Sequence, residues 1–344
     1  MPRPTISVIV VNWNGRDLLE DCLASLCSQR YEPCELIVVD NGSTDGSAQF
    51  IRDRFPTVKL VALAANTGFT GGNAAGLQVS RGEFIALINN DTRAAPTWLE
   101  HLIQPMLADP RIGICASKLI IEGSWQIDSS GDGLGTGGVG FKRGTGREAT
   151  QYALPEDVFG ACAAAALYRN EMLDAIGFLD EDFFFNDEDA DLNFRAQLAG
   201  WTCRYVPSAV VYHKVNATIG RLSDAHVYYH HRNLEFLWVK NMPAALMLRF
   251  FHHKLIQEIG GFCYICLRHG KWRTFFRAKR DALKMLPRML KKRRSIQRHK
   301  RVPNDHIKAM LTPIFSHELF WQKFALLTGW HHERLSPNRD RSLH

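Results

Sequence analysis

Asp40 and Asp91 each stand at the end of a short apolar run, where a carboxylate can serve a nucleotide or a metal ion. Asp40 ends ELIVVD and precedes a turn rich in Ser, Thr, Asp and Gly, so it could accept hydrogen bonds from a base N–H or from ribose hydroxyls. Asp91 ends INND, and a divalent cation held there could neutralise a departing diphosphate. An ordinary turn is the alternative, which we favour for Asp45; for Asp91 alone the signal is weak because Asn-Asp turns are common.

Residues 66–76, NTGFTGGNAAG, form a Gly- and Asn-rich segment that opens a predicted helix. Backbone N–H groups at a helix start, together with the helix dipole, make a ready anion site. The spacing matches neither the GxGxxG of dinucleotide-binding folds nor the GK[ST] of phosphate-binding loops. The segment therefore argues against NAD binding and against ATP hydrolysis.

Four carboxylates, those of Asp187, Glu188, Asp189 and Asp191, occur within five residues at the start of another predicted helix. Acids in a first turn are stabilised by the helix dipole, which is the ordinary explanation. Four such charges nevertheless repel one another unless a metal, a substrate or Arg195 compensates. A general base that deprotonates an acceptor hydroxyl would suit this cluster, although position alone does not say which acid serves.

The hydrophobic pattern predicts the elements that must position these residues. Strands are expected at 6–13, 35–40, 59–63 and 83–88, and helices at 16–29, 46–55, 72–80 and 97–107. This alternation with short connections predicts an α/β fold with an open, doubly wound, mostly parallel sheet flanked by helices. Ligands bind beyond the carboxyl ends of the strands in such sheets, where the loops 12–15, 40–47 and 89–92 lie.

The pattern changes in the second half of the chain. Residues 131–146 contain eight glycines in 16 positions, which predicts a mobile loop over a site and no regular element. Ordered structure should resume with the small-residue run 159–167, followed by a helix from about Asp187, strands through Tyr205 and 210–212, and an aromatic-rich helix over 225–240. His213 follows the last of these strands, and by itself a lone histidine is more often structural.

Positive charge is concentrated near the end of the chain. Residues 270–301 hold 14 Lys or Arg and one acid, whereas the whole chain carries a net charge of +7, so the remainder is mildly acidic. Because 277–294 interleaves Leu and Met with Lys and Arg, it predicts an amphipathic helix on an anionic membrane surface. We consider nucleic-acid binding less favourable because no recognised module accompanies the block.

Other features bound the class of protein. The start of the chain lacks the pattern of a signal peptide, and the most apolar stretch, 244–267, is interrupted by Arg249, Lys254 and Glu258, so no bilayer span is expected. The eight cysteines are mostly scattered in apolar surroundings and are expected to be reduced core residues. The pair Cys263 and Cys266 has no second pair at finger spacing, so we expect no zinc there.

Taken in order, these segments resemble the family 2 glycosyltransferases of the GT-A fold, especially the rhamnosyltransferase-like branch. The resemblance covers roughly residues 5–240, and its ordered set of motifs is specific although no single motif is. The matching segments are SVIVVNWNG (7–15), LIVVDNGSTDGS (36–47), NTGFTGGNAAG (66–76), INNDT (88–92), EDADLNFRAQLAGW (188–201) and VVYH (210–213).

The resemblance implies an inverting, metal-dependent glycosyltransferase and assigns roles to individual residues. Asp91 resembles the last acid of the family's DxD-type motif, here Asn89-Asn90-Asp91 without the first acid, and would hold Mg²⁺ or Mn²⁺ together with His213. Asp189 would be the catalytic base. The groups that would support it or orient the acceptor are Glu188, Asp191 and Trp201. The nucleotide-sugar would contact Asn12, Asp40, Asn66, Gly68, Asn73, Asn90 and Arg232.

The implied donor is a dTDP- or UDP-sugar, with dTDP-rhamnose as the best guess. The implied acceptor is a glycan or a polyprenyl-diphosphate-linked glycan in cell-surface polysaccharide synthesis, with no nucleic-acid partner. We expect a GT-A catalytic domain over 1–242, with a nucleotide-sugar part at about 1–120 and an acceptor part at about 121–242. A basic amphipathic helical extension over 243–344 would attach this cytoplasmic protein peripherally to the inner face of the cell membrane.

Two rival classes remain open from the sequence. One is another nucleotide-binding α/β enzyme such as a nucleotidyltransferase. The other is a non-catalytic basic module that binds membrane or nucleic acid, although such a module would leave the acidic motifs between 36 and 213 without a use.

Overall fold

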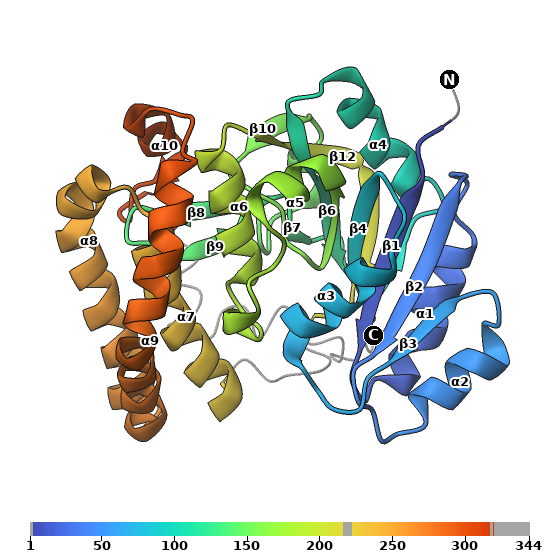
Figure 1. The fold of residues 1–344 in the computed structure, drawn as a ribbon, viewed down its shortest axis with the longest axis horizontal. Helices are drawn as coiled ribbons and strands as arrows, with labels where there is room; N and C mark the ends of the chain where they lie inside the picture. The colour runs from blue at the N-terminus through green and yellow to red at the C-terminus, as the bar shows by residue number, and fades with distance from the viewer. Residues whose placement is uncertain (1–2, 216–221, 317–318, 320–344) are drawn as a thin grey trace, which may run out of the picture.

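The computed structural model describes residues 3–215, 222–316 and 319, and is built around one mixed sheet with helices on both faces (Figure 1). The ten-stranded sheet has the order β10-β12-β6-β11-β4-β1-β2-β3, with β5 and β7 paired off this path. The last part of the predicted extension, 320–344, lies outside the described residues.

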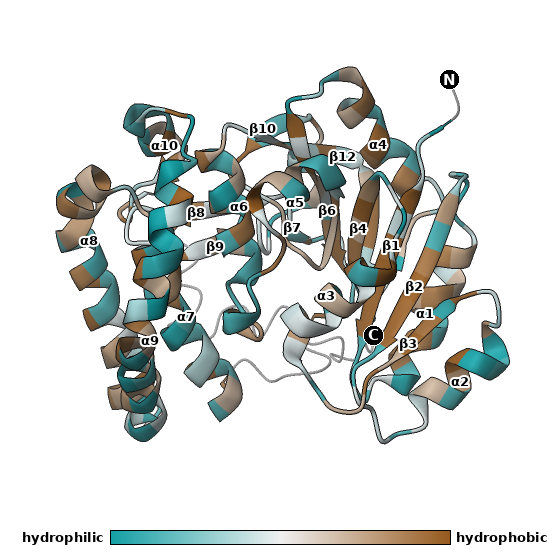
Figure 2. Cartoon of the chain, in the orientation of Figure 1, coloured by the Kyte–Doolittle hydropathy of each residue, from teal (hydrophilic) through white to brown (hydrophobic). Residues whose placement is uncertain are grey.

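The first half is the predicted parallel unit. Its elements are β1 (Ile6–Asn12), α1 (Arg16–Cys27), β2 (Cys34–Asp40), α2 (Ser47–Arg54), β3 (Lys59–Ala62), α3 (Gly68–Val79), β4 (Phe84–Asn89) and α4 (Trp98–Ala108). Val8 and Val10 face the core shared with α1 and α4, whereas Ile9 faces the opposite core, so both faces of β1 are buried. Its near-continuous apolar sequence follows from this position. Figure 2 shows the same strands as the most hydrophobic part of the molecule.

The second half completes the sheet with mixed strand directions. Its strands are β5 (Thr92–Ala94), β6 (Ile112–Ile121), β7 (Ile127–Ser129), β10 (Glu156–Val158), β11 (Ala165–Arg169) and β12 (Thr202–His213), and its helices are α5 (Asn170–Ile176), α6 (Glu188–Leu198) and α7 (Asp224–Asn241). The two strands predicted around Tyr205 and 210–212 are one strand, β12, whose pairing with β6 shifts register between Val206 and Val210. That irregularity explains why the sequence pattern is interrupted there.

The glycine-rich segment is ordered structure, and the prediction of a mobile loop over 131–146 was wrong. It forms an antiparallel hairpin of β8 (Asp132–Gly135) and β9 (Gly140–Lys142), and β13 (Leu311–Thr312) adds a third strand beside β8. The glycines permit close approach: a Cβ on Gly138, which has a φ of 80°, would lie 2.6 Å from the Trp238 ring. They are therefore packing positions in this hairpin.

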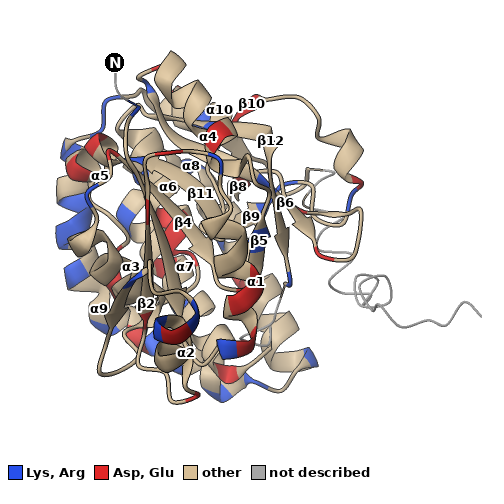
Figure 3. Ribbon diagram, turned by 90° about the vertical axis from the view of Figure 1, so that its right-hand side faces the viewer, with Lys and Arg blue, Asp and Glu red and all other residues tan. Residues whose placement is uncertain are grey.

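The helices α8 (Ala244–Phe262), α9 (Trp272–Arg298) and α10 (Asn304–Met310) form the C-terminal extension. The predicted amphipathic helix is α9, but its side chains Ala278, Ala282 and Met289 are buried in the protein. Figure 3 shows Lys and Arg gathered along this part of the chain. Several of them pair internally; for example, Lys292 Nζ lies 2.6 Å from an Asp182 carboxylate oxygen. No helix among the described residues is long and apolar enough to cross a membrane.

Candidate active site

Asn12 and Asp40 lie side by side because β1 and β2 are parallel with these residues in register. The Asn12 side chain accepts a hydrogen bond from Asn90 Nδ2 at 2.7 Å, which joins the ends of β1 and β4. Asp40 is buried, and its Oδ1 atom has no hydrogen-bond partner among the described residues. A buried carboxylate oxygen without a partner is costly, so this position is suited to a ligand N–H or hydroxyl.

Asn41 anchors the Gly- and Asn-rich segment at the start of α3, a role that the sequence did not indicate. Its Nδ2 atom donates to the Gly68 carbonyl at 2.9 Å, and its Oδ1 atom accepts from the Thr67 backbone N–H at 2.9 Å. The side chains of Asn66 and Asn73 make hydrogen bonds within the same segment. In this structure these two amides therefore shape the helix start.

Asp91 and His213 meet because β5, which directly follows Asp91, pairs with the end of β12. His213 Nε2 lies 3.2 Å from Asp91 Oδ1, yet that oxygen has no hydrogen-bond partner in the described part of the chain. Both side chains are more than nine-tenths buried. The contact brings together the two expected metal ligands.

Asp128, on β7, completes this arrangement and was missed by the sequence analysis. Its carboxylate lies 2.8 Å from His213 Nδ1 and also accepts hydrogen bonds from Lys142 Nζ at 2.8 and 3.0 Å. Burial by itself would lower the pKa of His213, but the neighbouring Asp128 and Asp91 carboxylates outweigh it and raise that pKa to about 9. Burial opposes ionisation of Asp128 as well, yet Lys142 and His213 hold its pKa well below the ordinary value.

These side chains fit a divalent metal ion. Asp91 offers a buried carboxylate oxygen without a hydrogen-bond partner, and His213 offers a ring nitrogen beside it. The second ring nitrogen faces the Asp128 carboxylate, which is the arrangement that orients metal-bound histidines in many proteins. Carboxylate and imidazole ligands with further oxygen from substrate phosphates would suit Mg²⁺ or Mn²⁺.

The four acids near the start of α6 have different environments. Asp191 is fully buried; its carboxylate lies 2.9 Å from Arg195 Nε and 2.8 Å from Lys240 Nζ, so it pairs within the core. Asp187 lies 2.9 Å from His230 Nδ1. Glu188 is buried, and burial together with the charge of Asp189 raises its pKa well above the ordinary value. Of the acids proposed to support the base, Asp191 is therefore engaged elsewhere.

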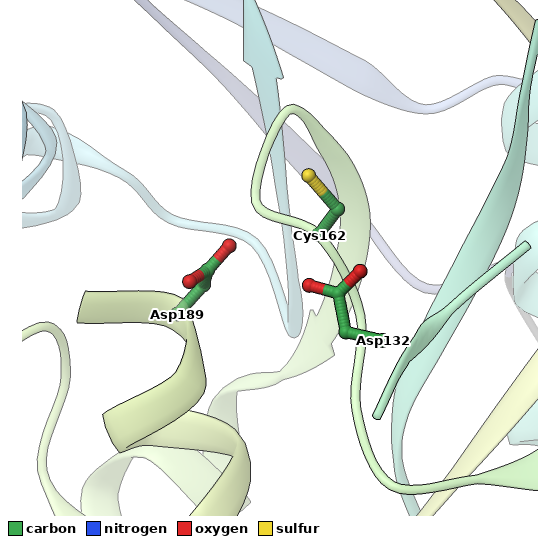
Figure 4. A group of neighbouring side chains, drawn as sticks. All are labelled: Asp132, Cys162 and Asp189. Carbon is green, nitrogen blue, oxygen red and sulfur yellow. The ribbon is translucent and has the colours of Figure 1, made fainter. Parts of the chain in front are cut away.

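Asp189 lies in a cluster with Asp132 on β8 and Cys162, two residues that the sequence did not indicate. Ligand atoms of the three side chains lie within 4.8 Å of one another, and Figure 4 shows the side chains pointing towards a common space. Asp189 accepts hydrogen bonds from the backbone N–H groups of Ala190 at 2.7 Å and Ala163 at 3.3 Å. Burial raises its pKa despite these two bonds, as expected of a carboxylate that can take up a proton.

Two predicted site residues, Trp201 and Arg232, make their contacts away from the Asp91–His213 pair and the Asp189 cluster. Trp201 follows the opposite end of α6 from Asp189 and packs in the apolar cluster that contains Met172. The Arg232 guanidinium donates to the backbone carbonyl of Phe183 at 2.9 Å and lies over the Tyr229 ring. Arg232 therefore holds the segment that precedes the acidic cluster, and the structure does not bring Trp201 to the site.

Comparison with known proteins identifies related sequences. Residues 7–177 match the sequence model of the family described as glycosyl transferase family 2. The chain is 28% identical over 253 residues to the N-acetylglucosaminyl-diphospho-decaprenol L-rhamnosyltransferase of Mycobacterium tuberculosis, an alignment that covers 66% of this chain and 82% of the relative.

Solved structures share the fold. The mannosyltransferase PcManGT from Pyrobaculum calidifontis, in complex with GDP-Man and Mn²⁺, matches with a TM-score of 0.53 and 17% identity over 96% of this chain and 83% of its own. GalNAc-T7 with UDP, GalNAc and Mn²⁺ matches with a TM-score of 0.55 and 15% identity, over 68% of this chain and about half, 48%, of its own. These similarities support the expected GT-A fold.

Proposed function

Since the chain belongs to glycosyl transferase family 2 and to its rhamnosyltransferase-like branch, we propose that it is an inverting, metal-dependent glycosyltransferase. The proposed donor is a dTDP- or UDP-sugar, with dTDP-rhamnose first, and the proposed acceptor is a glycan or a glycan linked to a polyprenyl diphosphate. The mycobacterial relative supports this choice, because it is an L-rhamnosyltransferase named for an N-acetylglucosaminyl-diphospho-decaprenol acceptor. Membership of the family disfavours both rival classes, the nucleotidyltransferase and the non-catalytic module.

One observation carries the proposal: a single segment, 127–142, contacts both the Asp91–His213 pair and Asp189. Asp128 in this segment lies against His213 and accepts from Lys142, and Asp132 lies in the cluster with Asp189. In the proposed reaction, Asp40 and Asn12 hold the nucleotide. Asp91 and His213 would hold a divalent ion, which when bound stabilises negative charge on the diphosphate leaving group. Asp189 accepts the proton of an acceptor hydroxyl while that oxygen bonds to the anomeric carbon and the bond to the diphosphate breaks, with inversion.

Peripheral attachment to an anionic membrane surface is also part of the proposal. On α8 the exposed apolar side chains Leu248, Phe251, Leu255 and Ile259 recur every three or four residues, so they share one face of the helix. The adjoining region carries the basic block of 270–301. An apolar helix face beside basic residues is typical of proteins that lie on anionic lipid.

A transfer assay tests the proposed activity. Purified protein is incubated with Mn²⁺, an N-acetylglucosaminyl-diphospho-polyprenol acceptor and a panel of dTDP- and UDP-sugars, and products are followed by mass spectrometry. We expect transfer from one or a few donors, its loss on chelation, and its loss in Asp91→Ala. A panel without any transferred sugar, or full activity in the presence of a chelator, would contradict the corresponding part of the proposal.

A further inference from the structure

Lys142 lies between the two halves of the site, which are the Asp91–His213 pair and the cluster around Asp189. Its Nζ atom donates to both oxygens of Asp128, the carboxylate that lies behind His213. In the β8–β9 hairpin Lys142 is the direct partner of Asp132 in the antiparallel register. Side chains of such opposite residues share one face of the sheet, with Cβ atoms about 5 Å apart. Lys142 therefore connects the metal side with the cluster around Asp189.

The surroundings of Asp189 are mostly acidic. Asp187 and Glu188 come from its own helix start. The other elements contribute Asp132 on β8, Lys142 on β9, Cys162 just before β11, and Tyr168 on β11. Within this set of groups, Lys142 supplies the positive charge. A carboxylate in such surroundings keeps its proton unless a cation opposes the burial and the neighbouring acids.

We propose that Lys142 is a positioning residue that serves both halves of the site: its ammonium group holds Asp128 behind His213 and balances the negative charge around Asp189. The electrostatics agree with the geometry. Burial raises the pKa of Asp189, and the backbone N–H groups of Ala163 and Ala190 together with the charge of Lys142 limit that rise. Burial, the charge of Asp189 and the neighbouring Asp128 raise the pKa of Asp132, and Lys142 again opposes the change.

The hairpin fixes the place of this ammonium group. A Cβ on Gly133 would lie 2.3 Å from the Phe141 ring, so a side chain opposite Phe141 would force that ring to shift. Asp132 exchanges backbone hydrogen bonds with Gly160, which joins β8 to the segment that carries Cys162. The register of β8 with β9 and the pairing of Asp132 with Gly160 keep Lys142 opposite Asp132, beside the segment that carries Cys162.

The inference rests on the proposed role of Asp189, and its test is the pH dependence of kcat/KM together with the Mn²⁺ concentration needed for half-maximal activity. In Lys142→Met the pKa of Asp189 rises, so more of the base is protonated at low pH. We expect the acid limb of the profile to move to higher pH by on the order of one unit. The Mn²⁺ requirement should rise roughly tenfold because Asp128 loses a partner.

Two further variants separate charge from hydrogen bonding. Lys142→Arg keeps the charge and should leave the acid limb in place. Lys142→Gln keeps a donor for Asp128 but not the charge, so the limb should move while the Mn²⁺ requirement changes less. Arg143→Met is the matched control: Arg143 directly follows β9, pairs with Glu156 and donates to the Ser130 carbonyl, so this variant removes a neighbouring cation with different contacts.

Three outcomes overturn the inference: an unmoved acid limb with an unchanged Mn²⁺ requirement in Lys142→Met, the same shifts in Arg143→Met, or a shift of the limb in Lys142→Arg. If Lys142→Met does not fold, the profile of Lys142→Gln decides. Asp189→Asn distinguishes the two proposals. Full activity in that variant overturns the proposed base, whereas its inactivity, together with an unmoved limb and an unchanged Mn²⁺ requirement in Lys142→Met, overturns this inference alone.

Discussion

The two halves of the site hold their side chains in different ways. Asn12 and Asp40 end adjacent strands and Asp91 lies two residues after the end of β4, so backbone register places them. Asp189 lies at the start of a helix and Lys142 lies in a hairpin. Contacts between segments that are distant in the sequence hold these two elements in place. The first half provides fixed positions for a ligand. In the second half, the pKa of each acid depends on the charges of its neighbours. Substitutions in the first half should mainly change binding, and those in the second should mainly change rate and charge state.

The largest effect is expected in Asp189→Asn, which removes the proposed base without changing the shape of the side chain. The transfer rate kcat should fall by ~10²–10⁴-fold, with little change in donor KM. Asp187→Asn is the matched control because asparagine tolerates the left-handed conformation found there, with a φ of 63°. Comparable losses in both variants would show that the effect is not specific to Asp189.

A loss of stability, with catalysis retained, is expected in Asp191→Asn. Asp191 is fully buried between Arg195 and Lys240, and removal of one partner from such a network typically costs about 3–5 kcal/mol of unfolding free energy. Urea unfolding followed by circular dichroism measures the change, and kcat is determined per folded molecule at low temperature. A stable variant that has lost turnover would assign Asp191 to the reaction.

A smaller effect is expected in Asp128→Asn, which weakens the partner of His213. Partners of metal-bound histidines typically contribute ~10–100-fold to metal affinity or activity, and we expect a loss in that range. Mn²⁺ titration of transfer activity measures it, with Asp157→Asn, an exposed acid on β10 that pairs with Arg204, as the control. An unchanged Mn²⁺ requirement would separate Asp128 from the metal site.

The smallest effect is expected in Asp40→Ala, which removes one proposed hydrogen-bonding group for the nucleotide. Loss of a charged hydrogen bond of about 1.5 kcal/mol corresponds to roughly a tenfold rise in donor KM at unchanged kcat. Initial rates over a range of donor concentrations provide both constants. A lowered kcat with an unchanged KM would break the proposed division between the two halves.

The strand-end positions of Asn12, Asp40 and Asp91 could be predicted because each follows an apolar run, and their roles stay predictions. The register of β1 and β2 and the pairing of β5 with β12 bring Asn12 to Asp40 and Asp91 to His213. The helix period also predicted the start of α6, but it could not distinguish Asp189 from Asp191. Their surroundings differ because different segments pack beside them. Asp191 pairs with Lys240 of α7, whereas Asp189 accepts from the backbone N–H of Ala163, which lies just before β11.

The second half was less predictable for the same reason. Asp132 and Lys142, together with Asp128 behind His213, lie in or beside a glycine-rich stretch, whose composition by itself predicts mobility. The close contacts that require these glycines involve Trp238 and Phe141, so they become visible only when the chain is folded. Trp201 and Arg232 show that a position in a motif does not determine the direction of a side chain: they lie against an apolar cluster and the Phe183 carbonyl.

The third strand beside the hairpin makes the order of folding relevant. β13, near the end of the described chain, pairs with β8, and the Thr136 backbone N–H donates to the Thr312 carbonyl at 2.9 Å. During synthesis the parallel half emerges first and can form from neighbouring segments, whereas this pairing joins parts that are far apart in the chain and forms slowly. The part of the chain that carries Asn12, Asp40 and Asp91 can thus fold while the chain is still on the ribosome. The small sheet that carries Asp132 and Lys142 would be completed only after residues 311–312 have left the exit tunnel.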